Sequence, residues 1–261
     1  MESKRIYFAS DFHLGSSSDG DSIDREKKIV RWLDSIKDSA SEIFLVGDLF
    51  DFWFEYKYVV PKGHIRLLGK LAEISDAGIQ LHIFTGNHDV WMFDYFEKEL
   101  NAKIYREPIE REWGGKRFMI GHGDGLGPGD SGYKLIKRIF TNRTCQRLFA
   151  ILHPYFGVTL ARFFSRKSRE SMGDKDDNYL GDDREFLVQY CNSVLDHKPI
   201  DYFIFGHRHM VLDKTLKNGQ SRYINLGEWF KSCNYAVFDF ESLALREFEE
   251  YNLTNSLGKV D

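Results

Sequence analysis

The chain has 261 residues, 42% of them hydrophobic, and a formal net charge of −4. This content suffices for one large domain, with or without an insertion, and the slightly negative charge argues against bulk nucleic-acid binding. The three cysteines, Cys145, Cys191 and Cys233, are odd in number and widely spaced, which predicts free thiols in a reducing compartment. We find no signal peptide and no apolar run of about 18 residues, so we expect a cytoplasmic protein.

Short runs of β-branched and aromatic residues alternate with helical patterns along the chain, which predicts an α/β class. The runs that predict strands are residues 5–9, 43–46, 81–84, 118–120, 202–205, 222–226, 235–240 and 244–248. Apolar residues at helical spacing predict helices over residues 22–38, 63–77 and 184–197. The segment Trp113-Gly114-Gly115-Lys116 predicts a hairpin turn between two strands.

Five of the predicted strands lead into clusters of residue types that bind divalent metals. The clusters are Asp11-Phe12-His13, Gly47-Asp48-Leu49-Phe50-Asp51, Gly86-Asn87-His88-Asp89, Gly121-His122-Gly123-Asp124 and Gly206-His207-Arg208-His209. Ligands of open α/β sheets gather outside the carboxyl ends of the strands. Taken alone, each cluster is equally typical of a turn, a helix start or surface histidines. Together they predict one site with carboxylate, imidazole and amide ligands, which suits two hydrolytic metal ions.

The segment between Gly125 and Gly181 is basic and apolar. From Lys134 to Arg169 it has nine Lys or Arg residues and no Asp or Glu, with large apolar side chains between them. This pattern predicts a pair of basic amphipathic helices, broken near His153-Pro154, that overhang the metals and favour an anionic membrane surface or anionic lipid. The alternatives are a helical hairpin with an ordinary solvated basic face, and a nucleic-acid patch.

The five clusters resemble the signature of the calcineurin-like metallophosphoesterases. The resemblance extends to the UDP-2,3-diacylglucosamine pyrophosphohydrolases of the lipid A pathway, through Phe52-Trp53, Asp130-Ser131-Gly132-Tyr133 and Leu226-Gly227-Glu228-Trp229. The chain departs from the proteobacterial enzymes at His88, where they typically carry arginine. The resemblance implies a sandwich of two mixed β-sheets flanked by helices. Residues 1–124 and 181–261 would form this core, and residues 125–180 a basic helical cap insertion.

The resemblance also implies a set of metal ligands. Asp11, His13 and His209 would hold the first ion, Asn87, His122 and His207 the second, and Asp48 would bridge both. We expect two divalent ions, with Mn²⁺ preferred and Fe or Zn as alternatives. Asp51 and Asp89 would act as catalytic partners that orient histidine or asparagine ligands, and His88 would donate to phosphoryl oxygens or to the leaving group.

The implied reaction is hydrolysis of the diphosphate of UDP-2,3-diacylglucosamine to UMP and 2,3-diacylglucosamine 1-phosphate. Trp53, with Phe140, Phe149 and Phe156, would line the acyl chains; Asp130 and Tyr133 would contact the sugar or nucleoside; Arg166, Lys167, Arg169 and Lys175 would bind the diphosphate. The expected partners are this nucleotide lipid and, peripherally, the inner membrane face, without nucleic acid or an obligate protein partner. The alternative is a soluble metallophosphodiesterase or phosphatase of unknown substrate.

Overall fold

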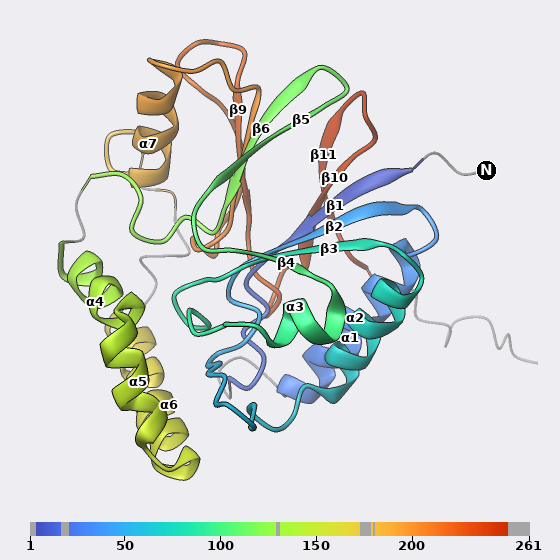
Figure 1. The fold of residues 1–261 in the computed structure, drawn as a ribbon. Helices are drawn as coiled ribbons and strands as arrows, with labels where there is room; N and C mark the ends of the chain where they lie inside the picture. The colour runs from blue at the N-terminus through green and yellow to red at the C-terminus, as the bar shows by residue number, and fades with distance from the viewer. Residues whose placement is uncertain (1–3, 17–20, 129–130, 173–178, 180, 250–261) are drawn as a thin grey trace, which may run out of the picture.

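Two β-sheets face each other in the computed structural model, which describes residues 4–16, 21–128, 131–172, 179 and 181–249 (Figure 1). The first sheet has six strands in the spatial order β11 (Leu243–Glu247), β10 (Asn234–Phe238), β1 (Arg5–Ala9), β2 (Ala40–Val46), β3 (Gln80–Phe84) and β4 (Lys103–Tyr105). The second has five in the order β5 (Ile109–Trp113), β6 (Lys116–Gly121), β7 (Tyr202–Phe205), β9 (Arg222–Leu226) and β8 (Val211–Thr215). Both sheets contain parallel and antiparallel pairs, so the sandwich of two mixed sheets is confirmed.

The central strands are parallel and buried on both faces, which explains why they read as continuous apolar runs. β1 pairs in parallel with β2, β2 with β3, and β6 with β7. Phe8, Phe44, Phe118 and Ile204 are fully buried between the two sheets. The carboxyl ends of these strands therefore meet where the sheets converge, near the centre of Figure 1.

Helices cover the outer face of each sheet. α1 (Ser22–Ile36), α2 (Ile65–Asp76) and α3 (Tyr95–Leu100) lie against the first sheet, and α7 (Phe186–Leu195) lies against the second (Figure 1). The side chain of Asp21 accepts a hydrogen bond from Ile23 N at 2.8 Å and so caps the start of α1. Buried Glu26 accepts from Arg66 N at 2.8 Å, which ties α1 to the first turn of α2.

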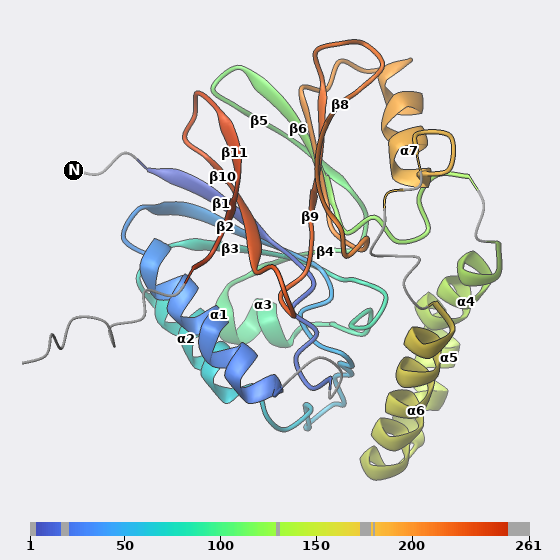
Figure 2. The same ribbon diagram turned by 180° about the vertical axis from the view of Figure 1, so that it is seen from behind.

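The segment after β6 forms three helices that stand apart from both sheets (Figure 2). They are α4 (Ser131–Thr141), α5 (Arg143–Ile151) and α6 (Pro154–Met172), and we refer to them as the cap helices. The prediction of two helices with one break was wrong, because Asn142 introduces a second break and so divides the first helix into two. Its side chain accepts from Thr144 N at 2.9 Å and from Cys145 N at 3.2 Å, so it ends α4 and caps α5.

The cap helices join the core through a small aromatic cluster. Trp91 donates from Nε1 to the carbonyl oxygen of Phe140 at 2.8 Å, and its ring lies 4.9 Å from that of Phe149. Phe54 lies 4.8 Å from Phe149 on the same side.

Among the described helices, none has the length and apolarity needed to cross a bilayer.

Candidate metal centre

Seven polar side chains from both sheets meet in one connected cluster. They are Asp11 and His13 after β1, Asp48 after β2, Asn87 after β3, His122 after β6, and His207 and His209 after β7. All seven had been singled out as ligands from the sequence. The cluster lies at the carboxyl ends of parallel strands, where the strand order of an α/β sheet leaves room for ligands.

One half of the cluster is formed by Asp11, His13 and His209, whose ligand atoms all lie within 4.8 Å of one another. The Nε2 atoms of the two histidines are 3.2 Å apart. Asp11 Oδ1 is 3.6 Å from His13 Nε2 and 3.7 Å from His209 Nε2. Two imidazoles and a carboxylate that converge this closely are a suitable ligand set for one divalent cation.

The other half is formed by Asn87, His122 and His207. Asn87 Oδ1 lies 3.3 Å from His122 Nε2 and 2.9 Å from His207 Nδ1. His122 Nδ1 lies 2.9 Å from the carbonyl oxygen of Val46, which orients the ring and directs Nε2 inward. Asp48 Oδ2 lies 3.3 Å from His122 Nε2 and 3.7 Å from His13 Nε2, so Asp48 stands between the two halves.

The backbone at the centre is bent in ways that most residues avoid. Asp11, His13, Asp48 and His207 have positive φ angles of 56°, 42°, 52° and 66°. Such conformations cost free energy and persist where the surrounding structure imposes them, often at functional sites. At Gly86 a Cβ atom would lie 2.0 Å from Asp48 Oδ1, so glycine is required for the two loops to approach.

The residues fit divalent metal ions on two grounds. Asp11 Oδ1 is buried and accepts no hydrogen bond within the described residues, which is costly for a carboxylate unless a cation is nearby. The donors are carboxylate, amide and imidazole, without thiolate, a set suited to Mn²⁺, Fe or Zn.

The protonation of the centre favours ligation by the carboxylates. Burial disfavours the charged form of Asp48, but His122 and His88 outweigh it and hold its pKa well below the usual 3.8. Burial lowers the pKa of His13 to about 4, so its ring is neutral at pH 7. Burial also opposes the charged form of His122, but the Asp48 carboxylate raises that pKa to about 10. His122 must therefore lose a proton when it ligates a metal.

The sequence of the chain matches a known protein family over most of its length. The family model described as calcineurin-like phosphoesterase matches residues 4–211. This chain belongs to the calcineurin-like phosphoesterase family. Membership implies bound divalent metals, in keeping with the seven side chains of the cluster.

Several relatives of this phosphoesterase carry the same curated name. The UDP-2,3-diacylglucosamine hydrolase of Porphyromonas gingivalis (strain ATCC BAA-308 / W83) is 40% identical over 263 residues, which cover 96% of this chain and 99% of the relative. The protein of that name from Aeromonas salmonicida (strain A449) is 26% identical over 232 residues and 88% of both chains. Among solved structures, the E. coli phosphoesterase YfcE is 13% identical with a TM-score of 0.45, and the match covers 92% of this chain and 91% of that one.

His88 of this phosphoesterase lies beside the metal centre rather than within either half. Its ring meets that of His13 edge-on at 4.8 Å, and its backbone N donates to Asp48 Oδ1 at 2.9 Å. His88 Nδ1 lies 3.2 Å from the carbonyl oxygen of Asp51 and 3.6 Å from Asp51 Oδ1. Asp51 is therefore placed to orient His88.

We had expected Asp89 to orient a histidine or asparagine side chain. In the structure it accepts hydrogen bonds from backbone amides instead. Its carboxylate is fully buried and accepts from Leu49 N and Gly86 N at 2.7 Å each, and from Phe50 N at 3.3 Å. These bonds tie the loop that carries Asp48 to the loop that carries Asn87. Burial, reinforced by the charge of Asp48, raises the pKa of Asp89 to about 7.

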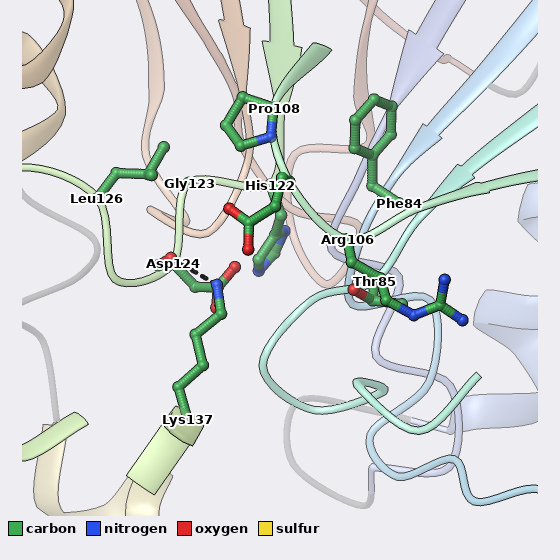
Figure 3. A pocket seen from close by; sticks show the side chains of 10 residues that line it. Phe84, Thr85, Arg106, Pro108, His122, Gly123, Asp124, Leu126 and Lys137 are labelled. Carbon is green, nitrogen blue, oxygen red and sulfur yellow. Dashed lines mark hydrogen bonds and ion pairs between the residues drawn. The ribbon is translucent and has the colours of Figure 1, made fainter. Parts of the chain in front are cut away.

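Lys137 of α4 reaches Asp124, close to His122, as Figure 3 shows. Lys137 Nζ lies 2.9 Å from Asp124 Oδ2, and Tyr133 donates to the same oxygen at 2.5 Å. A pocket of about 10 Å³, lined in part by His122, Asp124 and Lys137, lies there. Tyr133 is thus near the centre, with its ring 6.5 Å from that of His207, but it also anchors α4.

The prediction that Trp53 lines the acyl chains was wrong. Its side chain is fully buried, donates to Glu55 Oε1 at 3.1 Å and stacks on Phe50 with ring centroids 4.5 Å apart. The neighbours Phe52 and Phe54 face the cap helices instead.

Five of the predicted substrate contacts lie outside the part of the chain whose side chains the structure describes. Asp130 and Lys175 lie outside the described residues. Arg166, Lys167 and Arg169 lie on α6, and their side chains also fall outside the described part of the chain.

Two residues that contact the centre, Phe230 and Arg25, were missed from the sequence. Phe230 stacks on the candidate ligand His13 with ring centroids 5.4 Å apart, and the Arg25 guanidinium lies 4.4 Å from the centre of the same phenyl ring. Arg25 also donates to the carbonyl oxygen of His13 at 3.0 Å. Phe230 directly follows Leu226-Gly227-Glu228-Trp229, so that motif was the available signal.

Proposed function

We propose that this phosphoesterase hydrolyses the diphosphate of UDP-2,3-diacylglucosamine to UMP and 2,3-diacylglucosamine 1-phosphate, in the lipid A pathway. The observation that carries the proposal is the meeting of all seven candidate ligands in one cluster. The 40% identity to a UDP-2,3-diacylglucosamine hydrolase over 96% of this chain supports the choice of substrate.

We further propose that Asp11, His13 and His209 hold one ion, that Asn87, His122 and His207 hold the other, and that Asp48 bridges both. Two such ions, with Mn²⁺ preferred, would supply an activated water and neutralise charge at phosphorus. Asp48 and Asp11 remain ionised at neutral pH because the surrounding histidines lower the pKa of both carboxyls in spite of burial.

The protein side chains beside the ions would handle the protons and the leaving group. We propose that Asp51, whose carbonyl oxygen lies 3.2 Å from His88 Nδ1, orients His88 to donate to a phosphoryl oxygen or to the departing group. Asp89 keeps the two ligand loops in register through three backbone amides. A residue that positions the loops in this way preserves alignment during the reaction.

We propose a division into a core, residues 1–124 and 181–261, and a cap, residues 125–180, that binds lipid. The cap helices expose large apolar side chains, among them Leu148 at 61%, Ile151 at 79%, Tyr155 at 68% and Phe156 at 65%. Exposed apolar patches of this kind, with basic residues between them, favour acyl chains and anionic headgroups. The candidates for contact with the acyl chains remain Phe140, Phe149 and Phe156. Those for the sugar or nucleoside remain Asp130 and Tyr133, and those for the diphosphate remain Arg166, Lys167, Arg169 and Lys175.

We propose that the cap also contacts the inner membrane face, where the lipid substrate resides. The protein should then bind liposomes that contain anionic phospholipid, and salt should weaken this binding because attraction between surface charges is screened within about 10 Å at 0.1 M ionic strength. Replacing Arg138, Arg143 and Arg147 with Gln should abolish binding. Replacing Lys27, Lys98 and Lys116, which lie on the core, with Gln gives a control of equal charge that should still bind.

The decisive assay is phosphorus NMR of the purified protein with Mn²⁺ and UDP-2,3-diacylglucosamine. The two diphosphate resonances should be replaced by those of UMP and a sugar 1-phosphate, and Asp48→Asn should prevent this. The alternative, a soluble phosphodiesterase, predicts that a small diester such as bis(p-nitrophenyl) phosphate turns over at least as fast. No turnover of the lipid nucleotide, together with rapid turnover of the small diester, would replace the proposal with this alternative.

A further inference from the structure

The turn that carries the last two candidate ligands has a buried arginine on its opposite side. His207 and His209 reach the metal centre, while the Arg208 between them is only 5% exposed. Arg208 Nη2 lies 3.3 Å from Oε2 of Glu185, whose side chain is fully buried. The ion pair therefore joins the turn to the start of α7.

Glu185 stands at a junction of the chain. It is the residue before α7, and its backbone N donates to the carbonyl oxygen of Gly181 at 3.0 Å. The chain leaves the core for the cap helices past Gly127, where a Cβ would lie 2.4 Å from the carbonyl oxygen of Phe186. Both connections to the cap helices thus meet at the start of α7, against the partner of Arg208.

The turn itself is short, so the orientation of Arg208 constrains its neighbours. Arg208 N donates to the carbonyl oxygen of Gly206 at 2.7 Å, and His207 has a φ angle of 66°. At Gly206 a Cβ would lie 2.5 Å from Asp11 Oδ2, so the turn is also pressed against a candidate ligand. A displacement of the arginine must then move one or both of the flanking histidines.

A buried ion pair is a poor source of stability, because taking two charges out of water offsets most of their attraction. Apolar side chains of similar size would hold α7 against the turn at least as well. The guanidinium differs from them in being both planar and charged, so its contact with the buried Glu185 carboxylate at 3.3 Å favours one placement of the backbone that carries it. The benefit that remains for this pair is therefore the precise placement of the turn.

We propose that the Arg208–Glu185 ion pair is a positioning device for His207 and His209, which couples the base of the cap helices to the metal centre. The inference rests on the metal centre proposed above. Residues that orient metal ligands typically alter metal affinity by about 10- to 100-fold when they are replaced.

The test is the double variant Arg208→Met/Glu185→Met, which removes both charges and leaves no unpaired ion in the interior. Its melting temperature should stay close to that of the wild type. Its dissociation constant for Mn²⁺, measured by isothermal titration calorimetry, should rise by about 10- to 100-fold. The matched control is Lys217→Met/Asp196→Met, an exposed ion pair just beyond the other end of α7, which should leave both quantities unchanged.

Wild-type Mn²⁺ affinity and wild-type kcat in the double variant would overturn the inference alone, because the pair would then only support the fold. A wild-type protein that binds no divalent ion would overturn the metal centre and the inference with it. If the double variant does not fold, Arg208→Lys replaces it, since lysine keeps the charge and loses the planar fork. Unchanged Mn²⁺ affinity in Arg208→Lys would equally refute the inference.

Discussion

Replacing Trp91 with Leu should loosen the cap helices from the core without unfolding the core. The indole gives up one hydrogen bond, from Nε1 to the Phe140 carbonyl oxygen, worth about 1 kcal/mol. It also gives up ring contacts to Phe140 at 5.0 Å and Phe149 at 4.9 Å, each worth about 0.5–1.5 kcal/mol beyond burial. The local free energy that holds α4 and α5 against the core should fall by about 2–4 kcal/mol.

Hydrogen exchange with mass spectrometry measures this loss directly. Because about 1.4 kcal/mol corresponds to a factor of ten, amides in α4 and α5 should exchange roughly 30- to 1,000-fold faster, while those of β1, β2 and β3 should be unaffected. The apparent KM for the lipid nucleotide should rise, and turnover of a small diester should not change. Ile151→Ala is the control, since that side chain is 79% exposed and its loss should not affect docking. Unchanged exchange in α4 and α5 of Trp91→Leu would refute the view that this contact docks the cap helices.

Three further expectations concern the centre and the core. Chelation should abolish activity, and added Mn²⁺ should restore it. Asp48→Ala should lower the rate by several orders of magnitude even with Mn²⁺ present. Elemental analysis that finds active protein without Mn²⁺, Fe or Zn would contradict this expectation. His88→Ala should lower kcat by about 10²- to 10⁴-fold with metal content intact, and full recovery in His88→Arg would show that the position supplies charge rather than a proton. His82 Nε2 lies 2.8 Å from Glu42 Oε2 and lowers the pKa of Glu42 from its usual 4.5. The stability that this contact contributes is therefore present above pH 4.5 and is lost as the pH falls through the lowered pKa. Urea titrations of Glu42→Gln should therefore show a smaller loss of stability below pH 4.5 than wild type, and identical acid profiles would argue against that linkage.

The parts of the fold that sequence reasoning predicted are those in which burial imposes the residue type. β1, β2, β3, β6 and β7 are enclosed on both faces, so their sequences are continuous apolar runs. The ligand clusters could be located because each follows one of these strands. Their convergence in space follows from the parallel pairing, which sends all the carboxyl ends to one edge.

The missed elements lie where burial imposes little. β8 alternates exposed and half-buried residues at the edge of its sheet, and β4 is only three residues long. Neither carries the apolar signal of a central strand. The pattern of apolar residues continues across Asn142, so the sequence predicted an unbroken helix there. Only the hydrogen bonds that its side chain accepts from the next turn show that it is a cap.

The missed site contacts depend on tertiary packing that spacing cannot report. Phe230 reaches His13 from a loop more than two hundred positions later in the chain, so no local pattern links them. Arg208 lies between two candidate ligands in the sequence, and its partner Glu185 stands at the start of α7, so no local pattern links them. The division of Phe52, Trp53 and Phe54 between cap and core depends on which face of the segment is covered.

The strand order has a consequence for how the protein is made. β1 leaves the ribosome more than two hundred residues before β10, which is one of its two neighbours in the sheet. Until residues 234–238 have emerged, the nascent chain carries an apolar strand with one unpaired edge, the kind of surface that recruits chaperones or aggregates. The proposed ligand set likewise includes His209, so the proposed metal centre cannot be complete in a nascent chain that ends before that residue.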